Sequence, residues 1–163
     1  MSGVELSIDP AFVAPPVDDW SKWLDWASKL PASVAMGLEC VSVGPSRAVL
    51  TMAGSVWPLN PNASVHGGLV MAAADQAGGV AAVAALGQGA LPATATLHAL
   101  CLRPAFPGLT FDCRLVRGGT RLLFIDIDVT DRDGHLCTKF SGTWSVQGAA
   151  PPTRNVGESR SRV

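Results

Sequence analysis

The chain has few charged residues and no basic cluster. Only 15% of its 163 residues are charged, its formal net charge is -1, and no run of Lys or Arg occurs. This balance argues against nucleic acid as a partner, because binding to a phosphate backbone needs a basic surface. The first ten residues also lack the basic and apolar regions of a secretory signal.

Cysteine is scarce and scattered. Cys40, Cys101, Cys113 and Cys137 form no CxxC pair and have no zinc-binding spacing with the three histidines. We therefore expect no metal site and no cofactor. The four thiols are interpreted as reduced core residues of a cytoplasmic protein.

Familiar catalytic signatures are also missing. The chain contains no GxSxG elbow, P-loop, dinucleotide fingerprint or HExxH motif. One stretch, 69–86, is long and apolar, but it is rich in Ala and Gly and contains Asp75. An Asp near the centre of a membrane helix costs roughly 2.5–3.5 kcal/mol on insertion scales. We expect a buried core helix here and no membrane partner.

The start of that stretch is the most informative part of the sequence. A polar turn that begins at Asn60 leads through His66, Gly67 and Gly68 into the apolar helix that carries Asp75. Because an unpaired buried carboxylate is costly, Asp75 is either satisfied by nearby donors or has a chemical role. The amides of the two glycines would lie at the positive end of the helix dipole, where they can hold an oxyanion.

The spacing of these groups predicts how such a site is assembled. Asp75 follows Gly67 by eight residues, which is roughly 12 Å along a helix at about 1.5 Å per residue. One carbonyl cannot lie about 3 Å from both groups of the same chain. A shared reaction therefore requires a symmetric dimer, in which each site takes one group from each subunit.

The order of the predicted elements indicates an α+β fold. An amphipathic helix with three tryptophans is expected at 18–30, capped by Asp18 or Asp19 and stopped by Pro31. Its tryptophans either pack against the main body or line a ligand pocket. A hairpin, the helix at 65–86 and a four-stranded meander follow, with strands at 39–43, 47–53, 94–101, 109–116, 121–130 and 136–146. A helix that is apolar on all sides must be enclosed, and a curved antiparallel sheet can wrap it.

Several further polar residues have two interpretations each. Asn60 orients a water or a carbonyl, or caps its turn. His66 contacts a ligand or holds the loop. Thr94, Thr96 and His98 alternate and so are expected on one strand face, where Thr94 can hydrogen-bond Asp75 or a water. The late aspartates, Asp126, Asp128, Asp131 and Asp133, are expected on a solvated face.

The combined pattern resembles a known family. Asn60…His66-Gly67-Gly68…Asp75, together with Thr94…Arg103-Pro104-Ala105…Gly108 and Asp133-Gly134…Gly142-Thr143, is similar to hotdog-fold acyl-CoA thioesterases. The similarity covers about 36–147 and points to the branch of the phenylacetate-pathway thioesterase and the mammalian thioesterase-superfamily proteins. It implies an N-terminal extension at 1–35, a hotdog domain at 36–147 and a flexible tail at 148–163.

The resemblance also implies a reaction and an assembly. It implies hydrolysis of an acyl-CoA thioester by dimers joined through their sheets, often paired into tetramers. By carry-over, Asp75 is the nucleophile or general base, the Gly67 amide polarises the carbonyl, and Thr94 positions water. Asn60 and His66 would shape the site from the partner chain. Ala72, Gly78 and Gly79 would leave room for the acyl chain, and the Trp57 region would shape its pocket. Candidate substrate-binding residues are Gly68, Arg103, Arg117 and Arg121.

Two other functions remain open at this point. One is an enoyl-thioester hydratase on the same fold, although the Asp/His or Glu/His pair of such enzymes is absent in its usual motif context. The other is a non-catalytic acyl-CoA-binding module. The acyl group itself is open among aryl-acetyl, benzoyl and medium-chain acyl groups.

Overall fold

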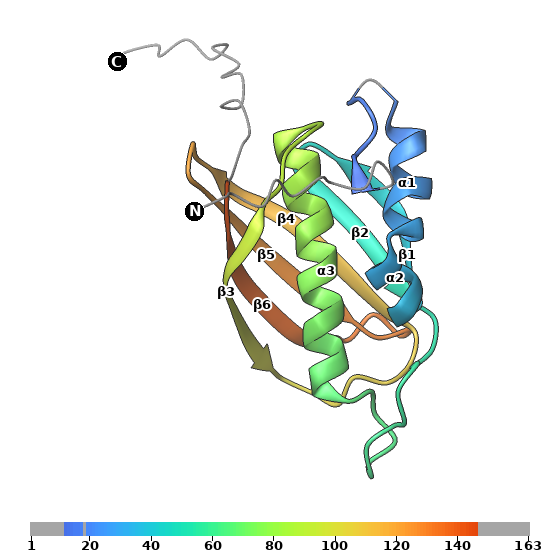
Figure 1. The fold of residues 1–163 in the computed structure, drawn as a ribbon. Coiled ribbons are helices and arrows are strands. Elements are labelled where there is room, and N and C mark those ends of the chain that lie inside the picture. Colours follow the sequence, from blue (N-terminus) through green and yellow to red (C-terminus); the bar gives the residue numbers. More distant parts are fainter. Residues whose placement is uncertain (1–11, 18, 147–163) are drawn as a thin grey trace, which may run out of the picture.

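A computed structural model describes residues 12–17 and 19–146 of the chain. The expected cap at Asp18 and the expected tail at 148–163 lie outside the described residues. Within them, one antiparallel sheet curves around a long helix, α3 (Gly67–Leu86), as the sequence predicts (Figure 1).

The sheet has six strands, and their bounds agree closely with the expected ones. They are β1 (Leu38–Gly44), β2 (Arg47–Met52), β3 (Ala93–Cys101), β4 (Leu109–Gly118), β5 (Leu122–Thr130) and β6 (Leu136–Ser145). Their spatial order is β1-β2-β4-β5-β6-β3, and every neighbouring pair is antiparallel. The two predicted hairpins, β4–β5 and β5–β6, are confirmed.

The prediction of a four-stranded meander is wrong for β3. This strand pairs with β6 at the far edge of the sheet rather than with β4. The segment 102–108, which holds two prolines, carries the chain away from β3 instead of turning it back into a hairpin. It is anchored beside the start of α3, where the Val65 amide donates to the Ala105 carbonyl at 2.8 Å. Strand β3 consequently has one sheet neighbour and one free edge.

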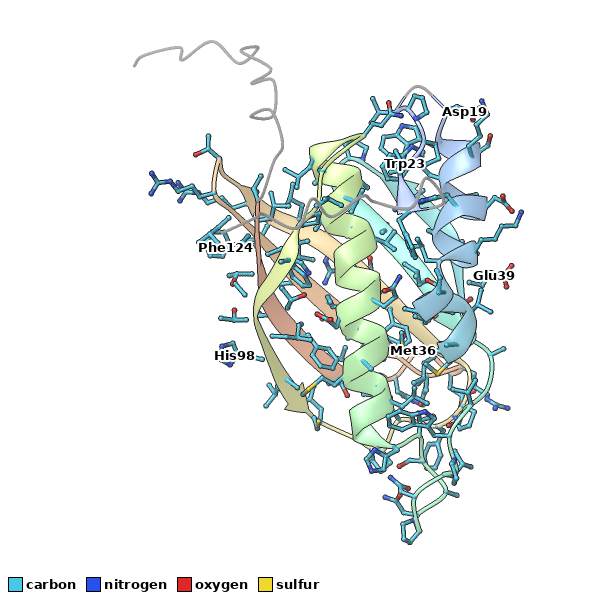
Figure 2. The ribbon with its side chains drawn as sticks, viewed as in Figure 1. Asp19, Trp23, Met36, Glu39, His98 and Phe124 are labelled. Atoms are coloured by element: carbon cyan, nitrogen blue, oxygen red, sulfur yellow. The ribbon has the colours of Figure 1, made fainter. Side chains whose placement is uncertain are left out.

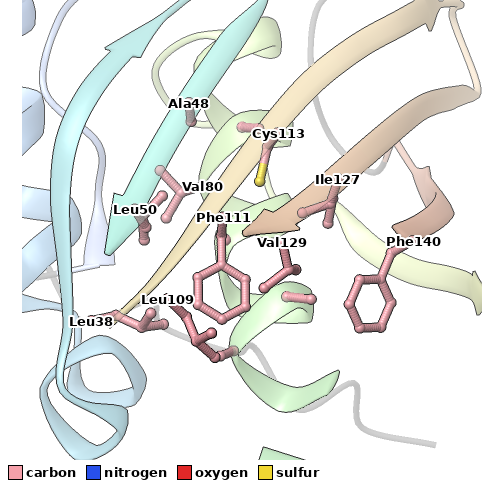
Figure 3. Packing of buried hydrophobic residues seen from close by; sticks show 14 of the residues in the cluster. Leu38, Ala48, Leu50, Val80, Leu109, Phe111, Cys113, Ile127, Val129 and Phe140 are labelled. Atoms are coloured by element: carbon pink, nitrogen blue, oxygen red, sulfur yellow. The ribbon is translucent and has the colours of Figure 1, made fainter. Parts of the chain in front are cut away.

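The core lies between the sheet and α3. Val80 of the helix packs over Leu50, Phe111 and Ile127 of the sheet, each at most 2% exposed (Figure 3). Ten of the helix residues are buried, on several sides of the helix, which explains why the helix has no polar stripe.

Two glycines let the helix approach β6 closely. A Cβ on Gly78 would lie 2.4 Å from the Trp144 ring, and one on Gly142 would lie 2.6 Å from it. The indole therefore fills the space beside Gly78, which the sequence analysis had assigned to an acyl chain. Beside Gly79, by contrast, a Cβ would meet nothing within 4 Å.

Helix α3 is long and apolar enough to cross a membrane by length and composition. The mean hydropathy of its most apolar 18-residue stretch is 1.6, and 56% of that stretch is buried inside the protein. A core helix of a soluble protein passes the same test, so this property is weak evidence for a membrane span.

Two short helices lie beside β1 and α3, with the first packed on β1 and the second between β1 and α3. The expected first helix is present as α1 (Trp20–Lys29), with Trp23 fully buried and its Nε1 donating to the Pro16 carbonyl at 3.0 Å (Figure 2). Pro31 ends this helix as predicted, but it also begins α2 (Pro31–Met36), because proline suits the first position of a helix. The carboxylate of Asp19 makes no capping bond to the backbone and instead accepts from Ser21 and pairs with Lys22.

The prediction that the cysteines lie in the core is confirmed for three residues and wrong for one. Cys40, Cys113 and Cys137 are buried, whereas Cys101 is exposed on β3. Burial raises the pKa of the Cys40 thiol to about 11 and raises the pKa of the Cys113 thiol even though Arg114 opposes it. These two thiols are therefore protonated and inert near neutral pH.

Candidate active site

The start of α3 is organised by His66. Its Nδ1 accepts a hydrogen bond from the Gly68 amide at 3.1 Å, so the ring caps the helix. The expectation that both glycine amides point at a ligand is therefore wrong for Gly68. Within the described part of the chain, the Gly67 amide has no such partner. A neutral His66 that accepts at Nδ1 carries its proton on Nε2, where it can donate to a ligand.

The preceding loop is held by Asn60. Its Oδ1 accepts from the Ser64 amide at 3.0 Å, and its Nδ2 donates to Ser64 Oγ at 2.7 Å. The turn-capping interpretation of Asn60 therefore applies. The loop also places Ala63 at φ 62, in a left-handed conformation that costs a non-glycine residue roughly 1–2 kcal/mol. Ser64, which is 2% exposed, escaped the sequence analysis because serine in a polar turn carries no distinctive pattern.

Asp75 lies in the middle of α3 and is half-buried rather than enclosed. Thr94 Oγ1 donates to Asp75 Oδ1 at 2.8 Å, which confirms one of the two roles considered for this threonine. The hydrogen bond fixes the carboxylate at the free-edge strand. The second oxygen, Oδ2, accepts no hydrogen bond from the described residues.

The three alternating residues of β3 do not share a face. The ladder with β6 shifts register between Thr94 and Thr96, and this irregularity changes the side to which the strand residues point. Thr94 faces α3, whereas Thr96 bonds Thr143 on the opposite side, with 2.8 Å between the hydroxyl oxygens. Figure 2 shows His98 also directed away from α3. His98 is therefore not a neighbour of Asp75.

A cavity of about 510 Å³ opens at the N-terminal end of α3. It is lined by Gly67 and Gly68, by Asn60 from the loop, and by Cys101 and Arg103 from the end of β3. Asp75 is not among its lining residues. The Gly67 amide and the Asp75 carboxylate thus lie apart on one helix, as the rise of the helix predicts.

The candidate arginines lie at two ends of the sheet. Arg103 follows β3 beside the Gly67 cavity. Arg117 and Arg121 flank the β4–β5 turn, next to the strand ends at Ser145 and Ala93. All three are exposed. Strand β3 joins the two ends, since it starts at Ala93 and finishes at Cys101.

The late aspartates are more structured than a solvated face requires. Asp128 pairs with Lys139 at 2.8 Å and with Arg114, and Asp126 accepts from Ser141 at 2.7 Å. Partial burial alone would raise the pKa of Asp128, but hydrogen bonds from Lys139 and Arg114 outweigh it and lower the pKa. One side-chain oxygen or nitrogen atom from each of Asp131, Asp133 and His135 lies within 4.8 Å of the other two. Asp131 Oδ1 also accepts hydrogen bonds from the backbone amides of the other two residues and thereby shapes the turn.

Comparison with known proteins identifies the fold and shows a similarity to one family over part of the chain. Residues 62–138 match the family model described as Thioesterase superfamily. Escherichia coli PaaI, from the phenylacetic acid degradation operon, has a similar structure, with a TM-score of 0.71 and 24% identity over 80% of this chain and 94% of that one. Thioesterase HI1161 of Haemophilus influenzae has a TM-score of 0.67 and 24% identity over 74% and 85% of the two chains. The architecture is that of the hotdog thioesterases.

Two further proteins are similar to this chain. The Streptococcus mutans protein smu.793, whose structure holds acetyl CoA, has a TM-score of 0.63 and 24% identity over 69% of this chain and 90% of that one. The Saccharolobus solfataricus protein named "Putative esterase SSO1253" is 39% identical over 83 residues. That match covers 50% of this chain and about half (55%) of the relative's length.

Proposed function

We propose that this hotdog-fold chain, similar to the thioesterase superfamily over residues 62–138, is an acyl-CoA thioesterase. It would hydrolyse an acyl- or aryl-acyl-CoA to the free acid and CoA at a site shared by two subunits. The observation that carries this proposal is that the two groups needed for the reaction lie far apart on one helix. A carboxylate held by Thr94 and a Gly67 amide with no hydrogen-bond partner among residues 12–17 and 19–146 lie eight residues apart on α3.

The free edge of β3 offers a way to join the two halves. Unpaired strand edges pair readily with another strand, and β3 has only exposed and half-buried residues. Antiparallel pairing of two β3 strands about a two-fold axis near Leu97 and His98 would set Thr94 opposite Cys101 of the partner subunit. Asp75, bonded to Thr94, would then lie at the partner's Gly67 cavity, which Cys101 lines.

The same pairing would gather positive charge for the CoA phosphates. Arg103 lies at the end of β3 that would meet the opposite end of the partner's β3. Arg117 and Arg121 of the partner subunit flank that opposite end. Three guanidinium groups would thus surround one CoA, although they are divided between the ends of a single sheet. Arginine is suited to this role because it binds phosphate oxygens through two parallel N–H donors.

The chemistry follows from these placements. The thioester carbonyl accepts a hydrogen bond from the Gly67 amide at the positive end of the α3 dipole, which stabilises the oxyanion as it forms. Asp75 of the other subunit removes a proton from the attacking water, or attacks the carbonyl itself to give an anhydride that water then opens. The C–S bond breaks, and CoA leaves as a thiolate and takes up a proton. Thr94 keeps the carboxylate oriented throughout.

Three variants test the divided site. Asp75→Asn keeps the shape of the side chain and should lower kcat by at least about 100-fold. Gly67→Pro removes the amide hydrogen at the first helical position, where proline is tolerated and where His66 at φ -58 and ψ 129 already suits a following proline. It should also lower kcat by about 100-fold or more. Gly67→Ala retains the amide and is the matched control, because a Cβ there meets nothing within 4 Å.

Co-production of the two inactive variants tests whether the site is shared. A mixed dimer of Asp75→Asn and Gly67→Pro subunits contains one complete site. If half of the dimers are mixed, about a quarter of the normal activity should return. No recovery, despite mixed dimers detected by mass spectrometry, would show that each chain has a complete site of its own. Full activity of Asp75→Asn would refute the proposed chemistry.

Assays with crotonyl-CoA address the hydratase. His98 faces away from Asp75, and His66 is occupied at Nδ1, so the described residues contain no Asp/His pair at this site. We expect release of free thiol without hydration of crotonyl-CoA. Binding of acyl-CoA without release of thiol would instead indicate the non-catalytic module.

A further inference from the structure

A second cavity, of about 370 Å³, lies between the N-terminal helices and the middle of α3. It shares no lining residue with the cavity at Gly67. Helix α1 contributes Trp26, α2 contributes Pro31, and α3 contributes Gly79 and Val80. The N-terminal segment therefore does more than cover the core, because it forms one wall of an open space.

The lining of this cavity is apolar. Its described lining has two polar side-chain groups. The Gln76 Nε2 donates to Ser33 Oγ at 3.1 Å, and the Trp26 indole N–H has no hydrogen-bond partner among the described residues. Ser33 is fully buried, so this amide is held by the protein. A cavity with few free polar partners binds water poorly and favours an apolar ligand.

The position of the cavity connects it to the proposed chemistry. Gln76 follows Asp75 directly, and Gly79 lies one turn further on the same side of α3, about 6 Å along the axis. Pro92, also in the lining, precedes the Asp75 partner Thr94 by two residues. The first few carbons of an acyl group bound at Asp75 can span this separation.

The cavity has the size and rigidity of a specificity pocket. A cavity of about 150 Å³ already holds benzene, so this one has room for an aryl or medium-chain acyl group. The space in front of Gly79 is empty, unlike that beside Gly78. Trp26 packs edge-on against the fully buried Trp23, with 5.3 Å between ring centroids, which holds that wall in place.

We propose that this cavity binds the acyl group of the thioester and that Trp26 and Gly79 determine which acyl groups are accepted. The inference rests on the proposed hydrolysis at Asp75, and it assigns the apolar end of the same substrate. It selects bulky apolar acyl groups over acetyl, because only they reach past Gly79.

Filling and enlarging the cavity test this proposal. Gly79→Leu places a side chain in the empty space, whereas Trp26→Ala removes a wall. Trp20→Ala is the matched control, because Trp20 is a half-buried tryptophan of the same helix that does not line the cavity. The measurement is kcat/KM for acetyl-, hexanoyl- and phenylacetyl-CoA; the last two separate linear from aromatic groups.

Gly79→Leu should lower kcat/KM for hexanoyl- and phenylacetyl-CoA by about tenfold or more relative to acetyl-CoA. Trp26→Ala should change the ratio between the linear and the aromatic substrate, and Trp20→Ala should leave all ratios as in the wild type. If Gly79→Leu affects all three substrates equally, or none of them, the acyl group binds elsewhere and the inference is wrong.

Binding measurements separate this inference from the proposed hydrolysis. In the Asp75→Asn background, titration with CoA and with the three acyl-CoA esters gives the affinity contributed by the acyl group alone. Tighter binding of the longer esters that is lost on adding Gly79→Leu supports the cavity even if the wild type hydrolyses none of them. Normal hydrolysis with unchanged selectivity in Gly79→Leu would overturn the cavity assignment and leave the hydrolysis intact.

Discussion

The two edges of the sheet differ in how far other elements cover them. At one edge, α1 covers β1, where Leu38 and Cys40 are at most 5% exposed and the Cys40 amide donates to Ser28 Oγ of the helix at 2.8 Å. At the other edge, no described element lies beyond β3, and Leu100 is 58% exposed. Natural proteins protect strand edges from unwanted pairing. An edge left open beside a fixed carboxylate is the surface that the second subunit of the proposed dimer would cover.

The cysteines give the most sensitive test of this contrast, since each edge strand contains one. With a pKa of about 11, only about one Cys40 thiol in a thousand is ionised at pH 8. We expect a thiol reagent to label Cys101 at least about 100-fold faster than Cys40 when the folded protein is diluted until its subunits are separate. Timed labelling followed by peptide mass spectrometry measures both rates. Equal rates would show that α1 does not protect the β1 edge.

A charge on the open edge should separate the subunits. Leu100→Asp places a charged side chain on each of the two β3 strands that would pair, and because Leu100 is exposed, the single chain should still fold. We expect a monomer by sedimentation velocity and a loss of activity of about 100-fold. Val41→Asp is the matched control, since Val41 is 49% exposed on β1. A Leu100→Asp protein that stays dimeric and active would place the interface elsewhere.

A similar contrast, between packed and open surroundings, exists at two neighbouring glycines of α3. Gly78→Ala forces a methyl group into the Trp144 ring and should destabilise the protein by about 1–3 kcal/mol. Gly79→Ala meets open space and should stabilise it by roughly 0.5–1 kcal/mol, the usual gain of alanine over glycine in a helix. Urea denaturation monitored by circular dichroism gives both values. Changes of the same sign in the two variants would contradict the packing around Trp144.

The smallest expected effect is a loss of stability at the β1 edge, which α1 covers. Ser28→Ala removes the acceptor of the Cys40 amide and should reduce the free energy of unfolding by about 1 kcal/mol. Its activity should remain normal, because Ser28 lines neither of the two cavities. Ser21→Ala, on the exposed side of the same helix, serves as the control in the denaturation experiment. An equal loss in both variants would mean that the Ser28 bond contributes nothing specific.

Much of the fold is readable from local patterns. The strand expected at 136–146 is observed at Leu136–Ser145, and the helix expected at 65–86 at Gly67–Leu86. The helix spacing also predicts that Gly67 and Asp75 cannot meet. These features depend on residues close together in the sequence, through hydrophobic periodicity, turn residues and the rise of a helix.

Other features depend on contacts between distant residues, which no local pattern contains. The place of β3 beside β6, the irregularity that turns Thr96 and His98 away from Asp75, and the Trp144 ring against Gly78 all arise from packing across the sheet. So does the cavity between Trp26 and Gly79, because its walls come together only when α1 docks on α3. The amino-acid order specifies the two groups of the site, and long-range packing determines which surfaces stay open to join them.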